Sequence, residues 1–191
     1  MMRIGLISDT HIASGMPGLD KLPPRIKEVL EGVDAILHAG DMISPFVLDE
    51  LEEIAPVLAA RGDDDPFSVD GRIKDIHNLH FEGFSLWLCH CLPFWMSSRS
   101  LYALFCYPSW NLLRDADDEI DGILQEITRQ HDEVPNVIVF GHAHTVLVHR
   151  HSRLLLINPG SPTLPDHRSM PGTVAILSLS EGKADAEIIQ L

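Results

Sequence analysis

The sequence predicts a layered α/β fold, an α-β-β-α sandwich of two mixed sheets flanked by helices. Three observations predict it. Short apolar strands alternate with amphipathic helices in the first half of the chain, whereas the second half is rich in strands joined by short turns. The length of 191 residues fits one domain, so we expect residues 1–191 to share one core.

Strands and helices of the first half follow one another in a βαβαβ order. Apolar segments bounded by turn residues predict strands over 3–8, 34–39 and 57–60. Residues 23–32 (PPRIKEVLEG) begin with proline and end with glycine, which predicts a helix. A second helix is expected from a Ser44–Pro45 cap through Ile54, with one apolar face made by Phe46, Leu48, Leu51 and Ile54. This order implies parallel strands with right-handed crossovers.

Hairpins dominate the second half. Apolar patterns around short turns predict three of them, at 79–82 with 84–90, 146–148 with 154–157, and 173–179 with 184–189. A single strand is expected over 136–140. A helix is expected over 119–130, with an apolar stripe of Ile120, Ile123, Leu124 and Ile127.

The chain is strongly acidic, with 28 Asp+Glu, 14 Lys+Arg and a formal net charge of −14. Such a surface repels polyanions, so we expect neither a long nucleic acid nor an anionic membrane as partner. No apolar run approaches the ~20 residues of a membrane span, and the first residues fit a strand better than a signal peptide. Three cysteines make no disulfide framework, so we expect a cytoplasmic protein.

Candidate metal ligands follow the predicted strands. Histidine is frequent, with 11 residues. Aspartates and histidines follow five of the predicted strands. In chain order these five sites hold Asp9 and His11, Asp41, Asp63 and Asp64, His90, and His142 and His144. Ligands bind at the carboxyl ends of strands in open α/β sheets, so these side chains should converge. An adjacent glycine lets the backbone turn tightly and approach an ion. One such pair would more often be a capping Asp beside a surface His, but five sites together predict a metal centre with O and N ligands.

The order of these motifs resembles the calcineurin-like metallophosphoesterase superfamily. The motifs are D-x-H, G-D, G-D-D-D, a His after an apolar strand, and G-H-x-H followed by I-N-P-G-S. The short chain and INPGS at 157–161 resemble its small bacterial and archaeal phosphodiesterase branch. Carried over by motif, the resemblance implies a metallophosphoesterase-like fold and two metal ions. The first would be held by Asp9, His11 and His144, the second by Asp63, His90 and His142, and both would be bridged by Asp41.

The implied activity is hydrolysis of small phosphodiesters by a metal-bridging hydroxide. Two ions about 3.5–4 Å apart can clamp a phosphoryl group for in-line attack. Carboxylate and imidazole ligands suit Mn²⁺, which we expect, and also Fe²⁺, Zn²⁺, Co²⁺ or Ni²⁺. The ligands alone do not exclude a phosphomonoesterase or a nucleotide pyrophosphohydrolase. A non-catalytic metal-binding scaffold also stays open, since a retromer subunit uses this fold as a protein-interaction module.

Two aspartates depart from the family pattern. The family usually has Asn in place of Asp63, and the extra carboxylate lowers the residual charge of a two-ion site from about +2 to about +1. We hypothesise tighter metal retention, a less acidic bridging water and weaker attraction for dianions; alternatively, Asp63 simply replaces Asn as an oxygen donor. Asp64 stands where many members carry a His that protonates the leaving group, so it is our candidate catalytic acid. It and Asp65 also fit plain loop or cap residues.

Cys91 and the segment that follows it are the least family-like part. Cys91 stands where small relatives usually have Gly, and it is either a thiolate ligand or oxidation-sensitive group, or, more commonly, a small buried hydrophobe. Segment 93–110 holds six of the twelve aromatics. It could form a cap that stacks on substrate, a homo-oligomer contact or part of the core. Arg99 within it could reach a phosphate.

Two further features are expected to support the ligands from behind. His38, just before the Gly40–Asp41 pair, fits a buried structural position. The turn at 158–160 resembles the family loop that backs the metal site and should orient its groups by hydrogen bonds.

Overall fold

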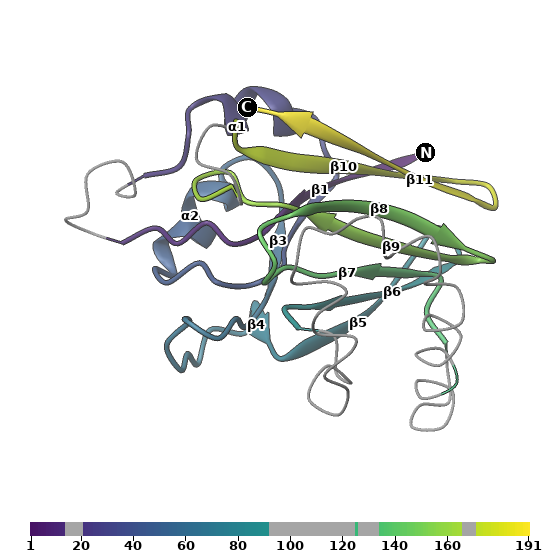
Figure 1. The fold of residues 1–191 in the computed structure, drawn as a ribbon, viewed down its shortest axis with the longest axis horizontal. Helices are drawn as coiled ribbons and strands as arrows, with labels where there is room; N and C mark the ends of the chain where they lie inside the picture. Colours follow the sequence, from purple (N-terminus) through teal and green to yellow (C-terminus); the bar gives the residue numbers. More distant parts are fainter. Residues whose placement is uncertain (14–20, 92–124, 126–133, 166–170) are drawn as a thin grey trace.

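The computed structural model describes residues 1–13, 21–91, 125, 134–165 and 171–191, and two sheets lie one over the other in it (Figure 1). Both sheets mix parallel and antiparallel neighbours. The predicted α/β fold with two mixed sheets is confirmed. Within the described residues, no helix is long and apolar enough to cross a membrane.

The first sheet has six strands in the order β11-β10-β1-β2-β3-β4. Its parallel part is β1 (Met2–Ile7), β2 (Ala35–His38), β3 (Val57–Ala60) and β4 (Ile73–Lys74). The hairpin of β10 (Thr173–Ser180) and β11 (Lys183–Gln190) joins antiparallel to β1. The predicted βαβαβ order and the last hairpin are therefore present.

The second sheet has five strands in the order β5-β6-β7-β9-β8. It contains two antiparallel hairpins, formed by β5 (Ile76–Phe81) with β6 (Phe84–Cys89) and by β8 (Val146–His151) with β9 (Leu154–Pro159). The short β7 (Val137–Val139) runs parallel to both β6 and β9 and so joins the two hairpins. Three strands, β6, β7 and β9, consequently point their carboxyl ends to the same edge.

Apolar side chains fill two layers. Between the sheets, Leu6 and Leu37 of the first pack in one cluster with Leu88, Val139 and Ile157 of the second. A second cluster packs the outer face of the first sheet against α1 (Arg25–Leu30) and α2 (Phe46–Glu52) through Ile26, Leu30, Leu48 and Leu51. Both faces of β1 and β2 are thus buried, which explains their continuously apolar sequences.

The structure corrects details of the helix and strand expectations. Ser44 gives no side-chain cap to α2, whose N-cap is Pro45. Phe46 is 73% exposed, because residues two apart lie on opposite sides of a helix and Leu48 faces inward. Strand β4 was not predicted because it is too short to show a pattern, and β5 begins at Ile76, three residues before the predicted start at position 79. The predicted helix at 119–130 and the segment 93–110, with Arg99, lie outside the described residues.

Candidate metal centre

The structure brings all eight predicted site residues together at one edge of the two sheets. They follow the carboxyl ends of β1, β2, β3, β6 and β7, as expected from the topology. Their donor atoms form overlapping groups, and within each group all atoms lie within 4.8 Å of one another. The groups contain Asp9, His11, Asp41, Asp63, Asp64, His90, His142 and His144, together with Cys91.

The first cluster consists of Asp9, His11 and His144. The Nε2 atoms of the two histidines are 3.1 Å apart, and His144 Nε2 lies 3.5 Å from Asp9 Oδ1. Asp9 is completely buried, and its carboxylate accepts the backbone N–H of His142 at 3.0 and 3.1 Å. This hydrogen bond fixes the carboxylate relative to the loop after β7.

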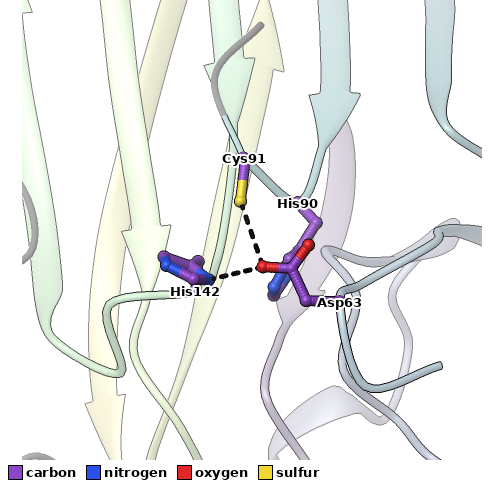
Figure 2. A group of neighbouring side chains, drawn as sticks. All are labelled: Asp63, His90, Cys91 and His142. Carbon is purple, nitrogen blue, oxygen red and sulfur yellow. Dashed lines mark hydrogen bonds and ion pairs between the residues drawn. The ribbon is translucent and has the colours of Figure 1, made fainter. Parts of the chain in front are cut away.

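The second cluster consists of Asp63, His90, Cys91 and His142 (Figure 2). Asp63 Oδ2 lies 3.3 Å from His142 Nδ1 and 3.8 Å from Cys91 Sγ. The side chain of Asp63 is 67% exposed, so this cluster opens towards solvent. Cys91 is only partly buried, and the expectation that it is a buried hydrophobe is wrong, because its sulfur turns towards polar groups.

Asp41 lies between the two clusters. Its Oδ2 is 3.7 Å from His11 Nε2 in the first cluster and 3.3 Å from His90 Nε2 in the second. Its other oxygen accepts the backbone N–H of Asp64 at 2.9 Å. One carboxylate therefore faces both clusters, which is the placement a bridging ligand requires.

Asp64 lies at the open side of the site. Its Oδ2 is 3.6 Å from His11 Nδ1, and its side chain is 63% exposed. The carboxyl is therefore accessible to a bound molecule while remaining close to the first cluster. This placement is compatible with proton donation to a leaving group, and equally with orienting His11.

Hydrogen bonds fix which ring nitrogens face the clusters. The carbonyl oxygens of Ala39 and Leu164 lie 2.7 Å from His90 Nδ1 and 2.8 Å from His144 Nδ1. Because a carbonyl only accepts, each Nδ1 must carry the proton, which leaves Nε2 directed to the cluster. His90 Nε2 is fully buried and has no hydrogen bond of good geometry among the described residues. A buried nitrogen of this kind, beside carboxylates, fits a divalent cation.

The carboxylates and imidazoles shift each other's pKa values. Burial raises the pKa of Asp9 to about 6. For Asp41, burial alone would raise the pKa, but the close His90 ring, with Nε2 3.3 Å from Asp41 Oδ2, outweighs it and lowers the pKa to about 2. For His90, burial alone would lower the pKa, but Asp41 and Asp9 raise it to about 9. Positive charge is thus stabilised where the two clusters meet.

Five of the ligand candidates adopt left-handed backbone conformations. Their φ angles are 52° for Asp9, 42° for His11, 55° for Asp41, 70° for His142 and 53° for His144. This conformation costs non-glycine residues on the order of 1–3 kcal/mol each and concentrates at functional sites. Asp and His tolerate it better than most residues, and it turns successive side chains towards one point.

Asp65 holds the loops that carry Asp41. Its carboxylate accepts the backbone N–H groups of Asp41, Ile43 and Gly62 at 3.0, 2.7 and 2.7 Å. Gly62 cannot carry a side chain, because a Cβ there would lie 2.1 Å from Asp41 Oδ1. The sequence analysis treated Asp65 only as a loop or cap residue. Its position three residues after a glycine, in an Asp-rich turn, is the signal for a capping carboxylate.

Two further contacts support the site from behind, as expected. In the 157–161 segment, Asn158 Nδ2 donates to Gly141 O at 2.9 Å and Ser161 Oγ donates to Asp9 O at 2.7 Å. His38 is fully buried; its Nδ1 accepts the N–H of Gly40, and its Nε2 lies 3.1 Å from Thr10 Oγ1. Burial lowers the pKa of His38 to about 3, so the ring is neutral.

The fold and the site define a class: two-sheet α/β proteins with a carboxylate–imidazole centre at the strand ends. The chain belongs to the calcineurin-like phosphoesterase superfamily, whose domain model matches residues 2–182. It is 30% identical over 191 residues to a probable metallophosphoesterase of Methanothermobacter thermautotrophicus, covering 99% of this chain and 92% of that protein. It is 26% identical over 171 residues to a phosphodiesterase of Methanocaldococcus jannaschii, covering 83% of each.

Solved structures agree on the fold. Wild-type Vps29 of Entamoeba histolytica, complexed with Zn²⁺, matches with a TM-score of 0.64 and 17% identity over 99% of both chains. The resemblance inferred from the motifs is therefore confirmed. Family and relatives point to a phosphoesterase hydrolase, and the structure supplies candidate ligands for the divalent metals that the family binds.

Proposed function

We propose that the protein is a two-metal phosphodiesterase acting on small phosphodiesters. Asp9, His11 and His144 would hold one ion, and Asp63, His90 and His142 the other. Asp41 would bridge them, and we expect Mn²⁺ to support activity. The observation that carries the proposal is the position of Asp41, whose Oδ2 lies within 3.7 Å of one histidine from each cluster.

Two divalent ions bound here would act as Lewis acids that neutralise charge on phosphoryl oxygens and activate water for in-line attack. The chain's own residues fix the geometry of that reaction. Asp9 and Asp41, both buried, keep the donor atoms in place before substrate arrives. Asp63 and Asp64, both largely exposed, lie on the side from which substrate approaches. We assign Asp64 as the group that protonates the leaving oxygen.

Charge favours diesters over monoesters. Asp9, Asp41 and Asp63 contribute three negative charges, so two divalent ions leave about +1 in place of the +2 of a site with Asn at position 63. A singly charged diester therefore loses less attraction than a dianionic monoester. The phosphodiesterase name of the M. jannaschii relative supports the same substrate class.

The wider setting follows from the composition. The formal net charge of −14 opposes long nucleic acids and anionic membranes as partners, which supports small substrates and a cytoplasmic location. We propose a single domain over residues 1–191, since the two sheets share one core. The aromatic segment 93–110 is proposed as a contact in a homo-oligomer.

The test is hydrolysis of bis(p-nitrophenyl) phosphate by metal-stripped protein, with Mn²⁺ titrated back and p-nitrophenyl phosphate measured in parallel. We expect Mn²⁺-dependent cleavage that favours the diester and is lost in His142→Ala. The matched control is His80→Ala, which removes an exposed histidine of β5 and should retain activity.

Other outcomes identify the alternatives. Preference for the monoester would indicate a phosphomonoesterase, and cleavage of a nucleoside diphosphate derivative alone would indicate a pyrophosphohydrolase. Stoichiometric metal binding without turnover of any of these would indicate a metal-binding scaffold instead of an enzyme.

A further inference from the structure

We propose that Cys91 is a fifth protein ligand of the second ion, besides Asp63, His90, His142 and the bridging Asp41, so that this position favours Zn²⁺, Co²⁺ or Fe²⁺ over Mn²⁺. The inference rests on the proposed function for the existence of that ion and adds the identity of a ligand and its preferred metal. Cys91 directly follows His90 at the end of β6, and its Sγ belongs to the same 4.8 Å group as the donor atoms of Asp63, His90 and His142.

The distances within the second cluster match those between ligands of one ion. Around a Zn²⁺ with five ligands at angles of about 90–120°, bonds of about 2.3 Å to sulfur and about 2.1 Å to oxygen or nitrogen separate a sulfur from an oxygen by about 3.1–3.8 Å, and a nitrogen from an oxygen by about 3.0–3.6 Å. Cys91 Sγ lies 3.8 Å and His142 Nδ1 3.3 Å from the same oxygen of Asp63. Figure 2 shows both side chains turned towards that oxygen, with His90 beside it.

A second observation points to a bound ion. His90 is 2% exposed, and its Nε2 lacks a hydrogen bond among the described residues although its Nδ1 is paired to Ala39 O. A buried imidazole nitrogen that is held in place and left without a hydrogen bond is suited to a cation.

Sulfur changes which cation this position prefers. Thiolate is a soft ligand that suits Zn²⁺, Fe²⁺ and Co²⁺, whereas Mn²⁺ prefers oxygen donors. In the first cluster the donors are only carboxylate and imidazole, from Asp9, His11 and His144. The two positions are thereby expected to differ in metal, with Mn²⁺ better tolerated in the first. On binding, the thiol proton leaves to the solvent and the thiolate binds the metal, which lowers the residual charge of the two-ion site from about +1 to about 0.

Cobalt reports sulfur ligation directly. Metal-free protein is titrated with Co²⁺, and the sulfur-to-cobalt charge-transfer band is followed in the near ultraviolet while bound cobalt is counted by elemental analysis. We expect the band in the wild type and its loss in Cys91→Ser with cobalt still bound. Cys89→Ala and Cys106→Ala are the matched controls and should keep the band; Cys89 Sγ instead lies against Val139 O in the sheet.

Competition between Zn²⁺ and Mn²⁺ gives a second readout. In Cys91→Ser the preference for Zn²⁺ should fall on the order of 10-fold or more, since losing even the indirect support of a metal ligand costs 10–100-fold in affinity. Two bound cobalt ions without the band, or a band that survives in Cys91→Ser, would overturn Cys91 as a ligand and leave the two-metal proposal intact. Failure to bind metal at all would overturn both.

Discussion

The two clusters use similar donors, but the protein holds them differently. In the first, Asp9 is completely buried, and Ser161 and the loop after β7 hydrogen-bond its carbonyl and carboxylate. In the second, Asp63 is 67% exposed and Cys91 only partly buried. In the proposed metal centre, an ion in the first cluster would therefore be enclosed by hydrogen-bonded structure, whereas an ion in the second would lie within reach of water and substrate.

Because one cluster is buried and the other open, we expect the two clusters to have different roles within one site. In the proposed metal centre, enclosure and hydrogen bonding make the first cluster the anchor. The open second cluster, with Asp64 nearby, is where a phosphoryl group can enter. Changes in the first cluster and in the residues behind it should act on both metal retention and folding, while changes in the second should alter metal preference and substrate charge.

The largest effect is expected from Asp41→Asn, because Asp41 serves both clusters. An amide oxygen carries no charge and is a much weaker metal ligand, so it bridges two cations poorly. Diesterase kcat/KM should fall at least about 100-fold, and both metal affinities should drop. Kinetics and elemental analysis after dialysis measure this, with Asp185→Asn on the exposed edge of β11 as control. A variant that kept both ions and full activity would contradict the bridging role.

Asp65→Ala should destabilise the loops around the site without removing a proposed metal ligand. The backbone N–H groups of Asp41, Ile43 and Gly62 lose their acceptor, so the free energy of unfolding should fall by about 1–3 kcal/mol. Urea denaturation of the metal-free protein measures it. The neighbouring Asp64→Ala, which removes an exposed carboxylate, should stay within about 0.5 kcal/mol of the wild type. An equal fall in the free energy of unfolding in both variants would contradict the stabilising role of the Asp65 hydrogen bonds.

The free energy of unfolding should also depend on pH through His38, which lies buried behind the first cluster. Its folded pKa of about 3 lies below the ordinary 6.5, so the unfolded chain takes up the proton first. The contribution of neutral His38 is fully present above pH 6.5 and is lost as the pH falls towards 3, by up to about 1.4 kcal/mol per pH unit. Urea unfolding of metal-free protein should show this slope, and His38→Asn should flatten it. An unaltered slope in the variant would assign the effect to other groups.

Asp63→Asn should give the smallest effect of these variants. It also tests most directly how the open second cluster differs from the enclosed first cluster. Removing this charge from the open cluster should weaken metal retention there, make the bridging water more acidic and shift the acidic limb of the pH–rate profile to lower pH on the order of one unit. The ratio of monoester to diester turnover should rise. Unchanged metal affinity together with an unchanged pH–rate profile would mean that Asp63 acts only as an oxygen donor.

Most of the frame could be predicted from sequence, because it depends on short-range patterns. Apolar segments bounded by turns identified the parallel strands β1 to β3, and the rule that ligands gather at strand ends brought together Asp9, Asp41 and His142 before any coordinates. Phe46 is exposed because a helix turns it away from the face of Leu48 and Leu51, which a pattern of apolar residues alone does not show.

The remaining features depend on contacts between distant segments. The local sequence marks Asp65 as a capping residue near Gly62, but it does not show that the carboxylate reaches back to Asp41 and Ile43, 24 and 22 residues away. The same holds for Cys91, whose apolar flanking sequence suggests burial although its sulfur turns towards Asp63, 28 residues away. Such pairings are set by loop paths that composition and periodicity do not encode.

Because of the left-handed backbone at five ligand candidates, we expect the thermal stability of the protein to depend on the concentration of free metal. Unfolding releases that strain, and an ion that binds only the native chain opposes unfolding by RT ln(1 + [ion]/Kd), about 2.7 kcal/mol at 100 times Kd. The melting temperature should therefore rise with free metal and fall on chelation. At elevated temperature, the fraction of protein that stays folded would then depend on the concentration of free metal ions.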